Sequence, residues 1–177
     1  MSRTVIASIE GEYRRYHQHT LAALAQLDDE LLNTPGPGGN NSVAVIIQHV
    51  SGNLRSRFTD FLTTDGEKPD RNRDAEFDEP HLTLDAARAL WTRGFDVVFA
   101  ALTELDDSHL TRTVTIREQA CSVIEALHRS LAHTAGHAFQ IVYLAKSLRG
   151  DEWHTLTIPR GQSAAYNMNP TLESPPR

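Results

Sequence analysis

Apolar residues recur every three or four positions over four long stretches of the chain, a spacing that predicts amphipathic helices. The first stretch contains Ile6, Ile9, Tyr13 and Leu24, and it stops before the Pro-Gly run of residues 33–39, which no helix can continue through. The four predicted helices span residues 2–32, 42–62, 83–105 and 122–148. Long amphipathic helices of this kind predict an all-α fold, a four-helix bundle, with inward-facing side chains available for a ligand or metal site.

The segments between the helices carry two further signals. Residues 63–79 are dense in Asp, Arg, Glu and Lys and are long for a plain connection, so we expect a crossover between the second and third helices. Residues 110–117 alternate and are rich in β-branched side chains, which is typical of a short strand before the fourth helix. We treat residues 1–177 as one domain with an ordered core over about 2–165 and a flexible C-terminal tail.

Composition and charge exclude several classes of protein. With 17 Lys and Arg against 23 Asp and Glu the net charge is −6, which argues against nucleic acid as a partner. No apolar stretch is long enough to span a membrane, and the N-terminal residues lack a signal-peptide pattern. Cys121 is the single cysteine, so neither an intramolecular disulfide nor a zinc site of several thiolates can form. We therefore expect a cytoplasmic protein.

Nine histidines stand out against this plain background. His133 and His137 are four residues apart, which places both imidazoles on one helical face, where they could bind one divalent metal. The alternative is a pair of solvated or capping histidines. No Glu follows His133, so the H-E-x-x-H pattern of metalloproteases is absent.

His49, within an apolar run of the second predicted helix, is the natural third ligand. The alternative is a core histidine hydrogen-bonded to a neighbouring hydroxyl or carbonyl. Three histidines that leave coordination positions open are typical of a catalytic metal site. Imidazoles suit zinc, nickel, copper and iron alike, so the ligand set does not select the metal.

Several motifs give the chain a family resemblance. They are Gln48-His49, Gly52-Asn53, the segments 65–69 and 71–74, residues 114–117, His133 to Ile141, and residues 158–163. On these motifs the chain resembles the DinB/YfiT-like superfamily of metal-binding four-helix bundles, in particular its uncharacterised members. The resemblance implies an up-down-down-up bundle, frequent homodimers, and a divalent metal, zinc or nickel above all, bound by His49, His133 and His137.

One departure from the superfamily pattern lies beside the predicted ligands. The superfamily often has H-x-G-Q where this chain has His137-Ala138-Phe139-Gln140, so the bulkier Phe139 could narrow a contact beside the site. Gln140 is retained and could hydrogen-bond a ligand or a metal-bound water.

The resemblance also implies a type of chemistry, because characterised superfamily members include transferases and an isomerase that use low-molecular-weight thiols. A metal would keep such a thiol cofactor as thiolate for attack on an electrophilic carbon of a small-molecule substrate. Arg71, Arg73, Arg117 and Arg160 are candidates to hold the carboxylates of the thiol, although a solvated or salt-bridged surface position is the better interpretation for each. We expect Cys121 only to pack.

Two other functions stay open. The first is metal-assisted hydrolysis, which needs a general base, and neither Glu125 nor Asp60 is convincingly placed for that role. The second is a metal-stabilised binding or stress-response protein without turnover.

Overall fold

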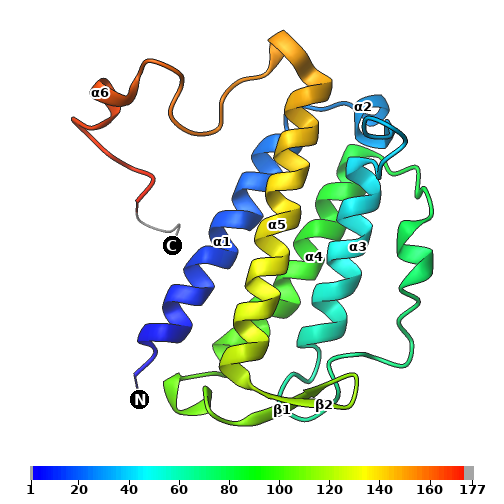
Figure 1. The fold of residues 1–177 in the computed structure, drawn as a ribbon, viewed down its shortest axis with the longest axis vertical. Helices are drawn as coiled ribbons and strands as arrows, with labels where there is room; N and C mark the ends of the chain where they lie inside the picture. Colours follow the sequence, from blue (N-terminus) through cyan, green and yellow to red (C-terminus); the bar gives the residue numbers. More distant parts are fainter. Residues whose placement is uncertain (1, 174–177) are drawn as a thin grey trace.

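The computed structural model describes residues 2–173 and is mainly helical, with one small two-stranded sheet. Four long helices lie side by side (Figure 1). They are α1 (Thr4–Leu24), α3 (Val43–Phe58), α4 (Leu84–Thr103) and α5 (Val123–Arg149). In Figure 1 the chain runs upward along α1 and α5 and downward along α3 and α4. The prediction of a mainly helical protein is confirmed.

Side-chain caps fix the starts of three long helices. The hydroxyls of Ser42, Thr83 and Ser122 each accept a hydrogen bond from the backbone N–H three residues later. Ser122 and Glu125 form a reciprocal capping box, which satisfies two N–H groups that the first turn leaves unpaired. These starts agree with the predicted helix bounds to within two residues.

The prediction of one continuous helix over residues 2–32 was wrong. The chain leaves α1 at Leu24 and forms a separate short helix, α2 (Asp29–Asn33). The Asp28 side chain accepts from the N–H of Leu31, and this local bond caps a new helix where the old one could have continued. Apolar spacing is preserved across the break because Leu27 still reaches the core.

The second long helix also ends earlier than predicted, at Phe58 and not near residue 62. Thr59 is extended and Asp60 has a positive φ of 48°, which turns the chain into the crossover. Phe61 keeps its apolar contact by folding back onto Phe58, with ring centroids 5.3 Å apart. Phe61 therefore packs against the helix from a turn, at a position where the periodic pattern predicted that the helix would continue.

The predicted crossover is present, and it lies along the side of α3 (Figure 1). It contains one short 3₁₀ helix, Asp74–Phe77, whose Glu76 is buried. Gln48 donates hydrogen bonds to the carbonyls of Ala75 and Asp78 and so ties this 3₁₀ helix to α3. The charged crossover therefore delivers a carboxylate into the interior.

The predicted single strand is one arm of a hairpin, formed by β1 (Thr113–Ile116) and β2 (Gln119–Ser122). The antiparallel register pairs Ile116 with Gln119, which leaves a two-residue turn, and both turn residues have positive φ, 54° and 62°. Such a turn usually needs Asn-Gly, but here it is Arg117-Glu118. The Asp65 carboxylate compensates by accepting from the N–H groups of both turn residues at 2.8 Å.

The core lies between the four long helices and contains large, fully buried side chains from each of them. No helix among residues 2–173 has the length and apolar character needed to cross a membrane. Beyond α5 the chain leaves the other helices as an arm that carries the short helix α6 (Ser163–Tyr166) (Figure 1). Residues 174–177 of the predicted tail lie outside the described residues.

Candidate metal centre

Three imidazole rings from two helices distant in sequence converge between α3 and α5. The Nε2 atoms of His49 on α3 and His133 on α5 are 3.3 Å apart, and one ring nitrogen from each of His49, His133 and His137 lies within 4.8 Å of the others. Two nitrogens that bind one zinc ion at about 2.1 Å with tetrahedral angles are about 3.4 Å apart. The three residues could therefore hold a metal ion, and residues 2–173 contain no second group of this kind.

Hydrogen bonds at the other ring nitrogens orient two of the imidazoles. The Nδ1 of His49 donates to Glu76 Oε2 at 2.9 Å, and the Nδ1 of His137 donates to Gln140 Oε1 at 2.9 Å. Each bond leaves Nε2 with a free lone pair, as metal binding requires. The Nδ1 of His133 is buried and has no hydrogen-bond partner among the described residues.

Glu76 is itself held in place by a buried ion pair. Arg71 donates from Nε and Nη2 to the two carboxylate oxygens at 2.8 and 2.9 Å, and only 5% of the Arg71 side chain is exposed. Burial acts to raise the pKa of the Glu76 carboxyl, but the hydrogen bonds from Arg71 and His49 outweigh it and hold the pKa below its ordinary value. The carboxylate that fixes His49 is thus ionised at neutral pH.

Glycine at position 52 makes this arrangement possible. A Cβ atom there would lie 2.3 Å from Glu76 Oε1, closer than real Cβ contacts allow. Gly52 lies on α3 almost one turn after His49, so the bare helix surface leaves room for the carboxylate beside the imidazole.

Burial favours the neutral form of the His133 and His137 imidazoles. Burial, followed by the neighbouring His137 and His49, lowers the pKa of His133 to about 4, and burial also lowers the pKa of His137. Neutral imidazole is the form that binds a metal, so both residues are ready for binding at pH 7 without losing a proton.

A pocket of about 170 Å³ opens beside the three imidazoles. Its walls include the α3 residues His49, Asn53 and Arg57 and the α5 residues Arg129, Ser130 and His133. Arg73 from the crossover and Arg117 from the hairpin turn complete a lining with four arginines and, among the described residues, no carboxylate. The pocket is therefore cationic, although the chain as a whole is acidic.

The family model described as "Protein of unknown function (DUF1572)" matches residues 1–162. The chain belongs to this family. No curated protein and no solved structure matches the chain. The matched range contains the three imidazoles and every residue of the pocket, so the site is part of the DUF1572 domain.

The structure separates the candidate cofactor-binding residues of this DUF1572 chain into different surroundings. Arg73 and Arg117 line the pocket, whereas Arg71 faces Glu76 and Gln140 contacts His137. Arg160 is exposed in the arm beyond α5 and is absent from the pocket lining.

The other residues singled out from the sequence lie away from the pocket lining. Cys121 is half-buried on β2, and burial followed by the charge of Glu125 raises the pKa of its thiol. Glu125 belongs to the cap of α5, and Asp60 is exposed in the turn after α3. The aromatic ring of Phe139 is half exposed and packs edge-on against Tyr16 of α1.

Sequence reasoning missed Glu76, Asn53, Arg57 and Arg129. Three of them carried a usable signal, since Asn53 and Arg57 follow His49 at intervals of four, and Arg129 precedes His133 by four. Glu76 carried none, because it is one acidic residue among many in a charged crossover.

Proposed function

We propose that the protein is a metal-dependent enzyme of the DinB-like four-helix-bundle type that acts on a low-molecular-weight thiol. In this proposal His49, His133 and His137 bind a divalent cation, zinc or nickel first among the candidates. The supporting observation is that three imidazoles, two of them oriented by hydrogen bonds, converge beside a cationic pocket that His49 and His133 line. The four long helices and their up, down, down, up directions support the bundle assignment (Figure 1).

The openness of the site favours a catalytic role over a purely structural one. His49 and His133 both line the pocket, so a guest molecule can reach the point where the imidazoles converge. A structural zinc site is closed by four protein ligands, whereas only three candidate ligands gather here among the described residues.

The chemistry of the pocket favours a thiol over a hydrolytic water. A bound divalent cation lowers the pKa of a thiol and keeps it as nucleophilic thiolate at neutral pH. Hydrolysis calls for a general base near the metal, yet no carboxylate occurs among the described lining residues, and Glu76 is already bound by Arg71. The pocket arginines, in contrast, suit the carboxylates of a small thiol.

Each part of the chain then has a defined task. Glu76 and Gln140 hold the proton on Nδ1 of His49 and His137, which turns the Nε2 lone pairs toward a common point. Arg71 keeps Glu76 ionised and in position. The pocket wall holds the thiol and its electrophilic partner close together, which lowers the entropic part of the barrier.

Metal content of alanine variants tests the ligand assignment. His49→Ala, His133→Ala and His137→Ala should each lose most of the bound metal measured by elemental analysis of the purified protein. His128→Ala is the matched control, since His128 is exposed on the same helix and lies outside the group of three. Unchanged metal content in all three variants would overturn the assignment.

Thermal-shift screening with metals and small thiols tests the reaction class. A thiol that raises the melting temperature only in the metal-loaded protein supports the proposal. If no thiol changes the melting temperature of the metal-loaded protein, the thiol chemistry is wrong even if the metal site stands. A homodimeric state and a cytoplasmic location remain predictions from the sequence.

A further inference from the structure

The walls of the pocket are two helical stripes that face each other. His49, Asn53 and Arg57 recur every four residues on α3, and Arg129 and His133 follow the same spacing on α5. Because α3 and α5 run in opposite directions (Figure 1), both arginines lie on the same side of the imidazoles, toward the β1–β2 hairpin. The pocket thus has a metal-binding end and an arginine end.

The four arginines of the pocket differ in the contacts that their guanidinium groups already make. Arg57 and Arg117 each donate to Glu67 at 3.0 Å, and Arg71 donates to the same carboxylate at 3.5 Å, so three guanidinium groups share it. Arg73 lies over the ring of Phe77 at 5.0 Å. Among the residues that the structure describes, Arg129 has no ion-pair or hydrogen-bond partner for its guanidinium, which is exposed at the mouth of the pocket.

The wall of the pocket also holds a buried polar side chain that has no hydrogen-bond partner among the described residues. Asn53 is only 9% exposed, and its side-chain amide makes no hydrogen bond to another described residue. Buried polar groups are costly unless they are hydrogen-bonded, so their presence in a pocket wall points to a polar guest.

We propose that the arginine end of the pocket, with Arg129 as its principal residue, binds the anionic group of a ligand whose other end reaches the three imidazoles. This inference rests on the proposed metal site and deepens the proposed function by stating the chemical class of the ligand. Arg129 precedes His133 by four residues, which places it about 6 Å further along the helix axis. The ligand is therefore a small molecule with a metal-binding head and a carboxylate or phosphate a few bonds away.

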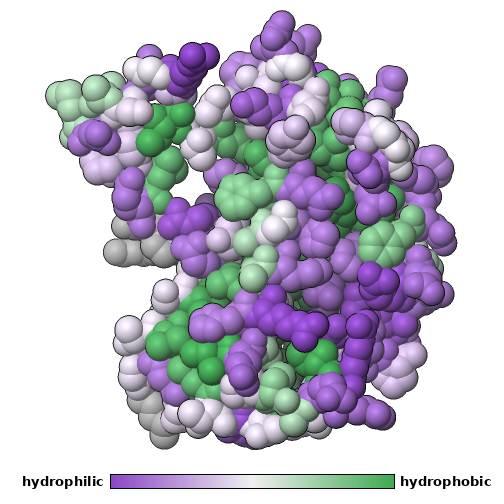
Figure 2. Space-filling view, in the orientation of Figure 1, coloured by the Kyte–Doolittle hydropathy of each residue, from purple (hydrophilic) through white to green (hydrophobic). Residues whose placement is uncertain are grey.

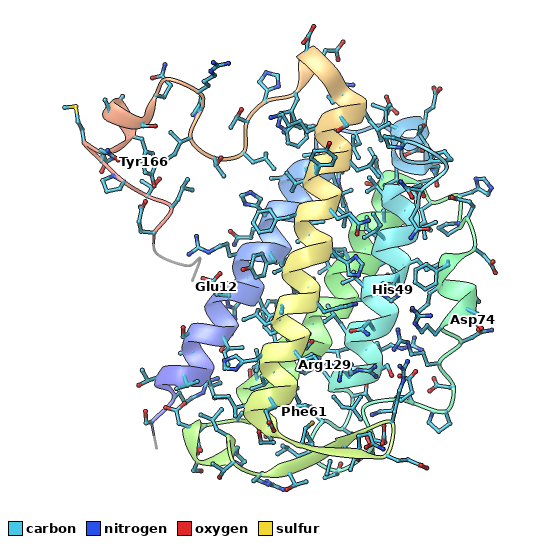
Figure 3. All side chains as sticks on the ribbon, viewed as in Figure 1. Glu12, His49, Phe61, Asp74, Arg129 and Tyr166 are labelled. Carbon is cyan, nitrogen blue, oxygen red and sulfur yellow. The ribbon has the colours of Figure 1, made fainter. Side chains whose placement is uncertain are left out.

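The views of the molecule agree with this placement. Figure 3 labels His49 on α3 and Arg129 on α5, on the side where these two helices face each other. On the same face, Figure 2 shows hydrophilic side chains gathered in a band across the lower halves of these helices. The pocket volume of about 170 Å³ lies below the range of drug-sized sites, so a small ligand, or the reacting end of a larger one, fits it.

The first arm of the test uses metal-free protein and inorganic phosphate, which probes the arginine end alone. Phosphate binding is measured by isothermal titration at low salt, with sodium chloride at equal ionic strength as the reference. Wild type should bind phosphate, and Arg129→Gln should weaken that binding about 10- to 100-fold, as expected for lost charge-assisted hydrogen bonds. Arg112→Gln, an exposed arginine outside the pocket, should bind like wild type.

The second arm uses zinc-loaded protein and two thiols of equal length, 3-mercaptopropionate and 3-mercaptopropanol, which differ only in the charged end. Wild type should prefer the carboxylate at least tenfold, and Arg129→Gln should remove the preference while leaving 3-mercaptopropanol binding unchanged. Equal binding of both thiols to wild type, or a preference that survives in Arg129→Gln, overturns the inference.

The two arms separate this inference from the proposed function. Phosphate binding that depends on Arg129, without binding of either thiol, supports the anion site and contradicts the thiol chemistry. Thiol binding without phosphate binding and without charge preference supports the thiol chemistry and contradicts the anion site. Phosphate binding that is equal in wild type and Arg129→Gln identifies an adventitious ion only and overturns the assignment of Arg129.

Discussion

The contact between Gly52 and Glu76 allows a sharp test of how His49 is positioned. In Gly52→Ala the new Cβ would lie 2.3 Å from Glu76 Oε1, whereas ordinary contacts begin at 3.4 Å, so the carboxylate must retreat by 3.4 − 2.3 = 1.1 Å. The same carboxylate holds His49 at 2.9 Å and Arg71 at 2.8 and 2.9 Å. A retreat of that size breaks at least one of these bonds.

The magnitude follows from two opposing effects. Replacing a glycine in a helix interior by alanine ordinarily stabilises a protein by about 0.5–1 kcal/mol. Loss of one charge-assisted hydrogen bond costs about 1.5–3 kcal/mol. Loss of the residue that orients a metal-binding histidine typically lowers metal affinity about 10- to 100-fold. We therefore expect Gly52→Ala to bind metal more weakly and to gain no stability.

Gly136→Ala is the matched control, because Gly136 also lies inside a long helix, between His133 and His137, and a Cβ there meets nothing within 4 Å. This variant should gain about 0.5–1 kcal/mol and keep its metal affinity. Metal-free Gly52→Ala should be about 1.5–3 kcal/mol less stable than Gly136→Ala, which is the cost of the lost bond, because the helix gain is common to both variants.

Two measurements decide the outcome. Urea unfolding of the metal-free variants gives the free energy of unfolding, and competition with a chromophoric chelator gives the metal affinity. If Gly52→Ala matches Gly136→Ala in both quantities, Glu76 does not hold His49 in the way described, and the account of the metal centre fails at that point.

Two further predictions concern stability and pH. Asp65 accepts three backbone N–H bonds, from Glu67 and from both turn residues of the hairpin, and these bonds lower the pKa of its carboxyl from 3.8 to about 2. The contribution of ionised Asp65 to the free energy of unfolding is full above about pH 4 and is lost as the pH falls toward 2. Asp65→Ala should therefore lower the free energy of unfolding by about 1–2 kcal/mol at pH 7, and the stability of this variant should depend less on pH between 4 and 2. The exposed Asp70 gives the control variant Asp70→Ala, and equal unfolding curves for both variants would contradict the stabilising role of the Asp65 hydrogen bonds. In metal-free protein the pKa of His133 is about 4 in the folded state against an ordinary 6.5. The unfolded chain therefore takes up a proton at this residue first, so the free energy of unfolding should be highest above pH 6.5 and should fall as the pH drops toward 4. His133→Gln should reduce that slope in pH-dependent urea unfolding, and an unchanged slope would show that His133 is not buried in its neutral form.

The long helices and the histidine pair were predictable because both depend on local spacing. Burial of an apolar stripe requires a repeat of three to four residues, and a pair of ligands on one helix requires an interval of four, so each leaves a mark in the sequence. The start of α5 was predictable for a similar reason, since Ser122 and Glu125 satisfy the first turn within four residues.

The breaks in these helices were not predictable from periodicity. Leu27 and Phe61 keep the apolar spacing, yet the chain has already left the helix at both positions. A side chain can reach the core from a turn as well as from a helix, so apolar spacing alone does not mark the end of an element.

The sequence by itself determined the mainly helical character of the protein and the identity of His133 and His137 as a pair on one face. Only the tertiary structure decided which charged residues surround that pair. Glu76 reaches His49 from 27 positions away, and Asp65 supports a turn more than 50 residues further along the chain. Electrostatic contacts between such distant residues impose no local spacing, so the carboxylate that orients the imidazole becomes recognisable only when the chain is folded.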